Sequence, residues 1–252
     1  MERRAPSQAH RRHCIKALIA TAAVLASLSL PHSAVAADSA ATKPKIGIIG
    51  SGRIGGTLGE LWVKSGYDVM FSSLDLAHDQ ELAAKLGPRA SAGTPAQAAA
   101  FGNVLLVSVP YKALPQLGKD LAADIKGKVV LDTSNPVQAR DGDMAVDAKA
   151  KGTGVASPEL LPGTRLVRAF NSVGANFLKT ETARAGDRIA IPLAGDDADA
   201  LRIASQLVRD AGFEPVVVGP LSRAKDFDVG TAVFGKAMTA SELRKALGLG
   251  AS

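Results

Sequence analysis

The feature that most constrains this chain is a glycine-rich turn between an apolar stretch and a segment with helical spacing. Residues 45–49 contain an apolar run with three isoleucines, which predicts a strand, and residues 53–65 carry apolar side chains on one helical face. The turn between them has three glycines with separate tasks: Gly50 makes the bend, Gly52 lets backbone approach a pyrophosphate, and Gly55 lets the helix pack closely on the strand. Free N–H groups at the helix start favour an anion. This context predicts a dinucleotide site; a plain strand–helix turn is the alternative.

The first residues of the chain differ in kind from the rest. Arginines and a lysine precede an apolar run at 17–30, and Ala34-Val35-Ala36 supplies the small residues that a signal peptidase requires. The run is shorter than the ~20 residues that span a bilayer comfortably, so no permanent membrane anchor is expected. We expect residues 1–36 to be a cleaved signal peptide and 37–43 a linker, with an uncleaved amphipathic tail as the alternative. The expected location is periplasmic or secreted.

The export route has two readings. The paired arginines Arg11-Arg12, followed by Lys16 ahead of the apolar run, resemble a twin-arginine signal. General secretory signals also carry arginines, so the general secretory route stays open.

Removing this segment changes what the composition implies. The chain has 30 Lys and Arg and 24 Asp and Glu, and residues 1–36 hold five and one of these, so the remainder has 25 minus 23, a formal charge of +2. With no basic patch interleaved with aromatics, a nucleic-acid partner is not expected. Cys14 and three of the four histidines also lie in the segment, which leaves His78. Neither a metal site nor a thiolate or histidine nucleophile system is therefore expected.

The remaining chain alternates apolar runs with helical segments, as in a mostly parallel sheet covered on both faces. We expect strands at 45–49, 67–71, 90–92, 104–109, 129–132, 166–170, 189–194 and 214–218. We expect helices at 53–65, 75–86, 95–100, 112–124, 175–183, 198–211 and from 239, with Thr94 and Ser241 as caps and with Asp196 and Asp197 as a cap and a first-turn acid. The segment 137–154 is expected to be a mobile surface loop or lid with one helical turn.

This pattern predicts an α/β fold, a Rossmann-type doubly wound sheet. Residues 44–170 would form the NAD(P)-binding domain, and residues 171–252 a smaller α/β half that extends the sheet. In such sheets ligands bind at the carboxyl ends of the strands. Four residues at expected strand ends should therefore converge on one crevice: Ser51, Ser72, Pro110 and Asn135. Ordinary loop chemistry is the alternative for these positions.

Six short motifs occur in a specific order along the chain. They are GSGRIG at 50–55, VSVP at 107–110, DTSNP at 132–136, AFNSVGA at 169–175, AGDD at 194–197 and VGPLS at 218–222. In this order and spacing the chain resembles the NADPH-dependent deazaflavin (coenzyme F420) oxidoreductases, a family related to the reductase domain of six-transmembrane metalloreductases. The resemblance implies hydride transfer between NADP(H), or NAD(H), and a flavin or deazaflavin co-substrate lying in the crevice.

The resemblance also implies site residues. Pyrophosphate contacts fall on Ser51, Gly52, Arg53 and Ile54, contacts with the adenosine 2′-phosphate on Ser73, Leu74 and near His78, and nicotinamide contacts on Val109, Pro110, Tyr111, Asn135, Asn171 and Ala175. Gly50, Gly55, Ser72 and Pro136 complete the candidate cofactor-binding set. The asparagines have turn chemistry as an alternative role, and Tyr111 has simple packing.

The preference for NADP(H) depends on the end of the second strand. No Asp or Glu lies there to hold a free ribose 2′-hydroxyl, and Ser72 and Ser73 can donate hydrogen bonds to a phosphate. Leu74 stands where the family pattern has arginine, and Asp75 follows it. We therefore expect NADP(H) to be preferred, but by less than in relatives with the arginine.

Hydride transfer between two stacked rings needs orientation and exclusion of water, with no obligatory nucleophile or metal. We therefore assign no catalytic residue. Two function classes remain open. One is an NADP-dependent oxidoreductase with a small-molecule flavin, deazaflavin or ferric-chelate acceptor, and the other is a non-catalytic nucleotide-binding module that acts as a sensor or assembly partner. A homodimer is compatible with either.

Overall fold

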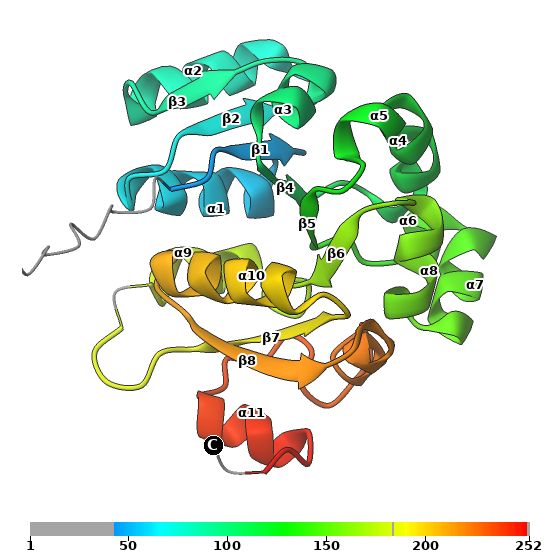
Figure 1. Cartoon of the computed structure of the whole chain (residues 1–252). Helices are drawn as coiled ribbons and strands as arrows, with labels where there is room; N and C mark the ends of the chain where they lie inside the picture. The colour runs from blue at the N-terminus through cyan, green and yellow to red at the C-terminus, as the bar shows by residue number, and fades with distance from the viewer. Residues whose placement is uncertain (1–42, 183, 251–252) are drawn as a thin grey trace, which may run out of the picture. The chain divides into compact units, whose positions relative to one another are not determined.

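The computed structural model describes residues 43–182 and 184–250. They are organised by an eight-stranded sheet with the order β3-β2-β1-β4-β5-β6-β7-β8 (Figure 1). The strands are β1 Ile46–Ile49, β2 Val69–Ser72, β3 Ala90–Ala92, β4 Val104–Val107, β5 Val129–Asp132, β6 Arg165–Arg168, β7 Ala190–Gly195 and β8 Glu214–Gly219. The expected signal peptide and all but the last residue of the expected linker lie outside the described residues.

Neighbouring strands run parallel except β6 and β7, which pair antiparallel. The predicted α/β class and doubly wound sheet are thus confirmed. The second half of the chain extends the first sheet through that one antiparallel pairing.

The helices cover both faces of the sheet. They are α1 Arg53–Lys64, α2 Leu76–Leu86, α3 Pro95–Phe101, α4 Leu114–Asp120, α5 Ala122–Ile125, α6 Gln138–Asp141, α7 Asp143–Lys151, α8 Thr153–Leu160, α9 Ala175–Thr180, α10 Ala198–Asp210 and α11 Ala240–Ala246, with 3-10 turns η1 Tyr111–Ala113 and η2 Leu221–Asp226. In Figure 1, α6, α7 and α8 gather at the right beside β6, and α11 lies below β8. Within the described ranges, no helix has the length and apolar character to cross a membrane.

The central strands are buried on both faces, which explains their continuous apolar sequences. Because successive side chains of a strand point to opposite faces, Ile48 packs in the same cluster as Trp62 of α1. Ile49 belongs to the cluster on the other face, with Leu105 and Val107 of β4. The sheet therefore has a core on each side, and the strand ends carry the loops that meet ligands.

An aromatic contact fixes α1 against the C-terminal half. Trp62 Nε1 donates a hydrogen bond to the carbonyl of Leu207 in α10, 2.9 Å away. The ring of Trp62 meets Phe170 edge to face at 6.3 Å, and Phe170 meets Phe213 in the same way at 6.2 Å. Phe170, just after β6, has a left-handed φ of 58°, a costly conformation that this packing stabilises. The loop after β6 is thereby held close to the glycine turn.

The predicted cap of α3 is confirmed, the predicted cap of α11 is not, and α2 has a cap that was not predicted. Thr94 caps α3 in a capping box with Gln97, as predicted, and Asp75 caps α2 by accepting a hydrogen bond from His78 N at 3.0 Å. The prediction of Ser241 as the cap of α11 is wrong: Thr239 is the cap, and Glu242 three residues later completes its capping box.

The segment 137–154 is not a loop. It forms α6, α7 and the start of α8, separated by Gly142 and Gly152, which have φ values of 61° and 81°. Helix α7 buries only Ala145 and Ala148, so its sequence lacks the wide apolar stripe that signals a packed helix. The expected helix at 112–124 is likewise divided, into η1, α4 and α5.

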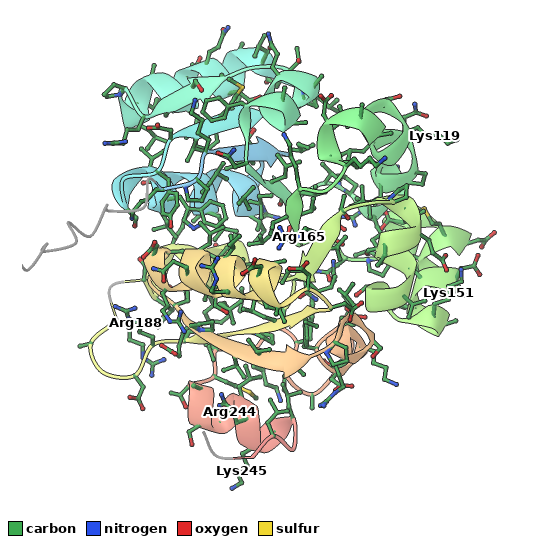
Figure 2. The ribbon with its side chains drawn as sticks, in the orientation of Figure 1. Lys119, Lys151, Arg165, Arg188, Arg244 and Lys245 are labelled. Carbon is green, nitrogen blue, oxygen red and sulfur yellow. The ribbon has the colours of Figure 1, made fainter. Side chains whose placement is uncertain are left out.

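The cationic side chains labelled in Figure 2 belong to several different elements. They come from α4, α7, β6, the segment before β7, and α11: Lys119, Lys151, Arg165, Arg188, Arg244 and Lys245.

Candidate nucleotide and acceptor site

Three adjoining hollows form one cleft along the carboxyl ends of β1, β2, β4, β5 and β6. The outer hollow (about 640 Å³) lies between the glycine turn, the turn after β2 and α4. The central hollow (about 320 Å³) shares Gly52, Ser108, Val109 and Pro110 with it. The aromatic hollow (about 500 Å³) shares Arg53, Ile54, Thr133 and Asn135 with the central one. These shared walls make the cleft continuous from the end of β2 to the loop after β6.

The outer hollow is walled mainly by apolar side chains. Its apolar lining includes Ile49, Pro95, Leu117 and Leu121. Leu74 stands at its mouth and is fully exposed. An apolar slot of this kind suits a flat heterocycle.

The glycine turn has one position that opens into the cleft. A Cβ at Gly50 would lie 2.3 Å from the carbonyl oxygen of Ser108, and one at Gly55 would lie 2.1 Å from that of Gly50. A Cβ at Gly52 would meet no protein atom within 4 Å. Gly52 lines both the outer and central hollows and immediately precedes α1, whose first N–H groups have no intrahelical partner. The turn therefore fits a pyrophosphate group.

Beneath the turn lies a buried carboxylate that the sequence analysis missed. Asp79 of α2 accepts hydrogen bonds from Ser51 Oγ and, at 2.8 Å, from Ser73 Oγ. Ser72 Oγ is also committed, because it donates to the carbonyl of Ile48 at 2.6 Å. The expectation that Ser72 and Ser73 present free donors to a phosphate is therefore corrected. The one sequence signal that could have identified Asp79 was the presence of an acidic residue in the first turn of α2.

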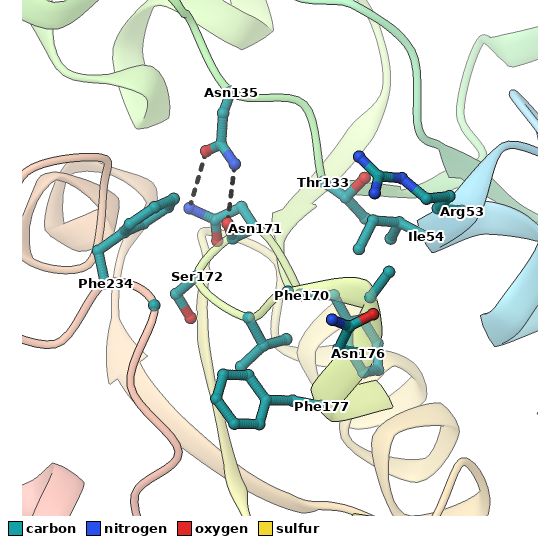
Figure 3. A pocket seen from close by; sticks show the side chains of 14 residues that line it. Arg53, Ile54, Thr133, Asn135, Phe170, Asn171, Ser172, Asn176, Phe177 and Phe234 are labelled. Atoms are coloured by element: carbon teal, nitrogen blue, oxygen red, sulfur yellow. Dashed lines mark hydrogen bonds between the residues drawn. The ribbon is translucent and has the colours of Figure 1, made fainter. Parts of the chain in front are cut away.

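Two asparagines join the loops after β5 and β6 (Figure 3). Asn135 Nδ2 donates to the carbonyl of Asn171 at 2.8 Å, and Asn171 Nδ2 approaches Asn135 Oδ1 at 3.5 Å. Asn171 Oδ1 is buried and has no hydrogen-bond partner among the described residues. Since Asn171 lines the aromatic hollow, that oxygen can accept a hydrogen bond from a bound molecule.

The aromatic hollow is lined by aromatic, aliphatic, small and uncharged polar residues, with one ionisable side chain among them. Phe170, Phe177 and Phe234 form much of its wall (Figure 3), and among its lining residues Arg53 is the one ionisable side chain. Phe234 and Gly235 come from the segment after η2. No strand end or motif in the sequence marks this segment as part of the site.

A buried ion pair supports the floor of the cleft. Arg168 at the end of β6 donates to Asp132 Oδ2 at 2.6 Å, and both side chains are completely buried. The Asp132 carboxylate also accepts from Ser134 N at 2.9 Å, and Asp228 Oδ1 lies 3.7 Å from the guanidinium. This pair ties together the strand ends from which the loops with Asn135 and Asn171 begin.

Most of the predicted site residues border the cleft. Its lining includes Gly50, Gly52, Arg53, Ile54, Ser73, Leu74, Val109, Pro110, Asn135, Asn171 and Ala175. Ser51, Gly55 and Ser72 lie buried beneath the turns that form it. Of the four strand-end residues expected to converge, the cleft thus brings together Pro110 and Asn135 directly.

Three predicted residues are placed elsewhere. The side chain of Tyr111 is buried in the core with its hydroxyl 3.3 Å from Ser157 Oγ, and burial raises the pKa of Tyr111 to about 12. Pro136 lines a separate small cavity near Asp228, and His78 is exposed on α2. The expectation that Tyr111 and Pro136 face the cleft is therefore corrected, whereas the exposed position of His78 leaves a contact near the adenosine 2′-phosphate as a prediction.

The two acids at 196 and 197 have structural roles. Asp197 caps α10 by accepting from Ala200 N, and its bond with Arg165 lowers the pKa of Asp197 to about 2. Asp196 instead accepts from Leu221 N at 2.9 Å, and Asp199 is the first-turn acid.

Comparison with known proteins agrees with this geometry. Residues 45–136 match the family described as NADP oxidoreductase coenzyme F420-dependent. The chain is 30% identical over 189 residues to metalloreductase STEAP3 of Rattus norvegicus, covering 73% of this chain and 36% of that protein. It is 29% identical over 151 residues to the F420-dependent NADP reductase of Methanothermobacter marburgensis, covering 58% of this chain and 66% of the relative. The matches thus span about a third and just under two thirds of these relatives.

The fold has a solved counterpart in protein SMa0349 from Sinorhizobium meliloti. The TM-score is 0.68 at 24% identity, with 77% of this chain and 95% of that chain covered. The sequence matches confirm the resemblance drawn from the six motifs. Similarity to the coenzyme F420-dependent NADP oxidoreductase family is therefore established for residues 45–136 of this chain.

Proposed function

We propose that the protein is an NADP(H)-dependent oxidoreductase that transfers a hydride between nicotinamide and a flavin or deazaflavin acceptor. The adenosine would occupy the outer hollow, the pyrophosphate would lie over Gly52 at the start of α1, and the nicotinamide would lie in the central hollow. Bound NADPH supplies the hydride. Val109 and Pro110 form a floor for the ring, and the Asn135–Asn171 bridge fixes the wall between the central and aromatic hollows.

The residues that line the aromatic hollow are the observation that supports a flavin or deazaflavin as the acceptor. Reduction of a carbonyl or imine requires a proton at the reacting atom, which enzymes supply from a positioned acid such as His, Lys, Tyr or a carboxylic acid. The lining of this hollow offers none of these groups. A flavin or deazaflavin ring spreads the charge of the added hydride over its conjugated system and takes its proton from water. Phenylalanine walls suit such a flat ring by stacking.

Rapid mixing of NADPH, the protein and a panel of acceptors tests this function. We expect NADPH oxidation with a flavin or a deazaflavin, in a one-to-one ratio to acceptor reduced. The variant Phe177→Ala should raise the KM for the acceptor severalfold and leave the Kd for NADPH unchanged. Phe177 lines the aromatic hollow and neither of the other two hollows. Tight NADPH binding with no oxidation by any acceptor, ferric chelates included, would instead favour a nucleotide-binding module without turnover.

We also propose that the protein is exported after folding around its nucleotide. Free NADP is not expected outside the cytoplasm, so an exported enzyme benefits from crossing the membrane already loaded. A ligand present at a thousand times its Kd stabilises the folded state by about 4 kcal/mol. We expect periplasmic protein that lacks residues 1–36 and carries nucleotide, and we expect the change of Arg11 and Arg12 to lysine to block export. Fractionation and N-terminal sequencing check both points; unimpaired export of the variant would assign the general secretory route.

A further inference from the structure

Asp79 lies where the glycine turn and the turn after β2 meet. Its side chain is buried and accepts hydrogen bonds from the hydroxyls of Ser51 and Ser73. A carboxylate has acceptors only, so both hydroxyl protons point towards Asp79. The start of α2 favours a negative charge at this place.

Ser73 consequently has no proton to offer a ligand. Ser73 Oγ lies 2.8 Å from the Asp79 carboxylate and 3.2 Å from the carbonyl oxygen of Asp75, so the carboxylate is the nearer acceptor for its proton. The Ser73 oxygen also accepts from Asp75 N at 3.1 Å, which leaves one lone pair for a ligand. A ribose 2′-hydroxyl can donate to that lone pair, whereas a 2′-phosphate brings only acceptors and negative charge.

The position of this turn matches the ribose of a bound dinucleotide. In a βαβ nucleotide site, the end of the second strand, ~20 residues after the glycine motif, reaches the ribose 2′-position. Ser73 and Asp75 line the outer hollow together with Gly52. Asp75 adds a second acid to the turn, and Lys112 on η1 is the cation that lines the same hollow.

We propose that Asp79 determines nucleotide specificity, by weakening the binding of an adenosine 2′-phosphate relative to a free 2′-hydroxyl. The proposal rests on the proposed function, because it assigns Asp79 a role within the nucleotide site. Asp79 acts as a positioning residue through the two serines.

The variant Asp79→Asn replaces one of the two hydrogen-bond acceptors that face the serines by a donor. A carboxamide accepts through its oxygen and donates through its nitrogen, so one serine proton becomes available to the ligand and one negative charge is lost. Calorimetric titration of the full chain with NADP⁺ and with NAD⁺ measures the result. We expect the affinity for NADP⁺ to rise about tenfold relative to NAD⁺, the effect of one charge-assisted hydrogen bond.

Two further variants keep the test decisive. Glu81→Gln removes the same charge from the exposed side of α2 and should leave the ratio of affinities unchanged. Ser73→Ala removes the lone pair and should weaken NAD⁺ severalfold with little change for NADP⁺, which tests the proposal even if Asp79→Asn fails to fold.

The outcomes separate the specificity role from the proposed function. An unchanged ratio in Asp79→Asn, or an equal shift in Glu81→Gln, would overturn the specificity role while the nucleotide site stands. Binding of neither nucleotide to the unmodified protein would overturn the proposed function and this role together.

Discussion

Replacing Gly52 by alanine should leave the fold intact and weaken nucleotide binding by at least about a hundredfold. The backbone at Gly52 has φ −67° and ψ −160°, an extended conformation open to alanine, and the added methyl group would meet no protein atom within 4 Å. It would instead occupy the space in which the start of α1 meets a pyrophosphate. Losing two charge-assisted hydrogen bonds of about 1.5 kcal/mol each weakens binding by about a hundredfold or more. Titration with NADPH and a thermal unfolding curve check the two halves of this expectation.

Two other glycines provide matched controls. Gly250→Ala adds a methyl group in open space far along the chain and should change neither binding nor unfolding temperature. Gly55→Ala should destabilise the fold itself, because its Cβ would press on the carbonyl oxygen of Gly50. If Gly52→Ala bound NADPH normally, the pyrophosphate would have to lie away from the glycine turn.

The strands could be predicted because strands buried on both faces have continuous apolar sequences. Strands β1, β4 and β5 are enclosed on both faces, so each is a short run of apolar residues followed by a turn residue. The strand ends then located much of the cleft, since a parallel sheet brings its carboxyl ends to one edge. Pro110 and Asn135 were found in this way.

What the sequence did not disclose depends on tertiary contacts. Helix α7 buries two small alanines and is stabilised by contacts with neighbouring helices. Its sequence therefore shows no periodic apolar stripe from which a helix could be predicted. Asp79 reads as an ordinary helix-face acid until the fold places Ser51 and Ser73 against it. Phe234 reaches the aromatic hollow from a segment without regular structure, to which periodicity does not apply.

Breaking the buried pair of Asp132 and Arg168 should cost far more stability than breaking a surface pair. Arg168→Met leaves the Asp132 carboxylate buried without its cation, which destabilises a fold by about 3–5 kcal/mol. The exposed pair of Arg89 and Asp68, 3.0 Å apart, is the control, and Arg89→Met should cost about 0–1 kcal/mol. Urea unfolding of the residue 37–252 chain measures both.

The double variant Asp132→Asn with Arg168→Met should recover most of the lost stability. It removes both buried charges together, and the new carboxamide can still accept from Ser134 N. The repaired protein is expected to keep most of its affinity for NADPH, because the glycine turn that meets the pyrophosphate follows β1. It is expected to have a raised KM for the acceptor, because the loops after β5 and β6 carry Asn135 and Asn171. Strictly additive losses in the double variant would show that the two side chains act independently. The ion pair would then stabilise each strand end separately and could not be what holds the two loops in register across the aromatic hollow.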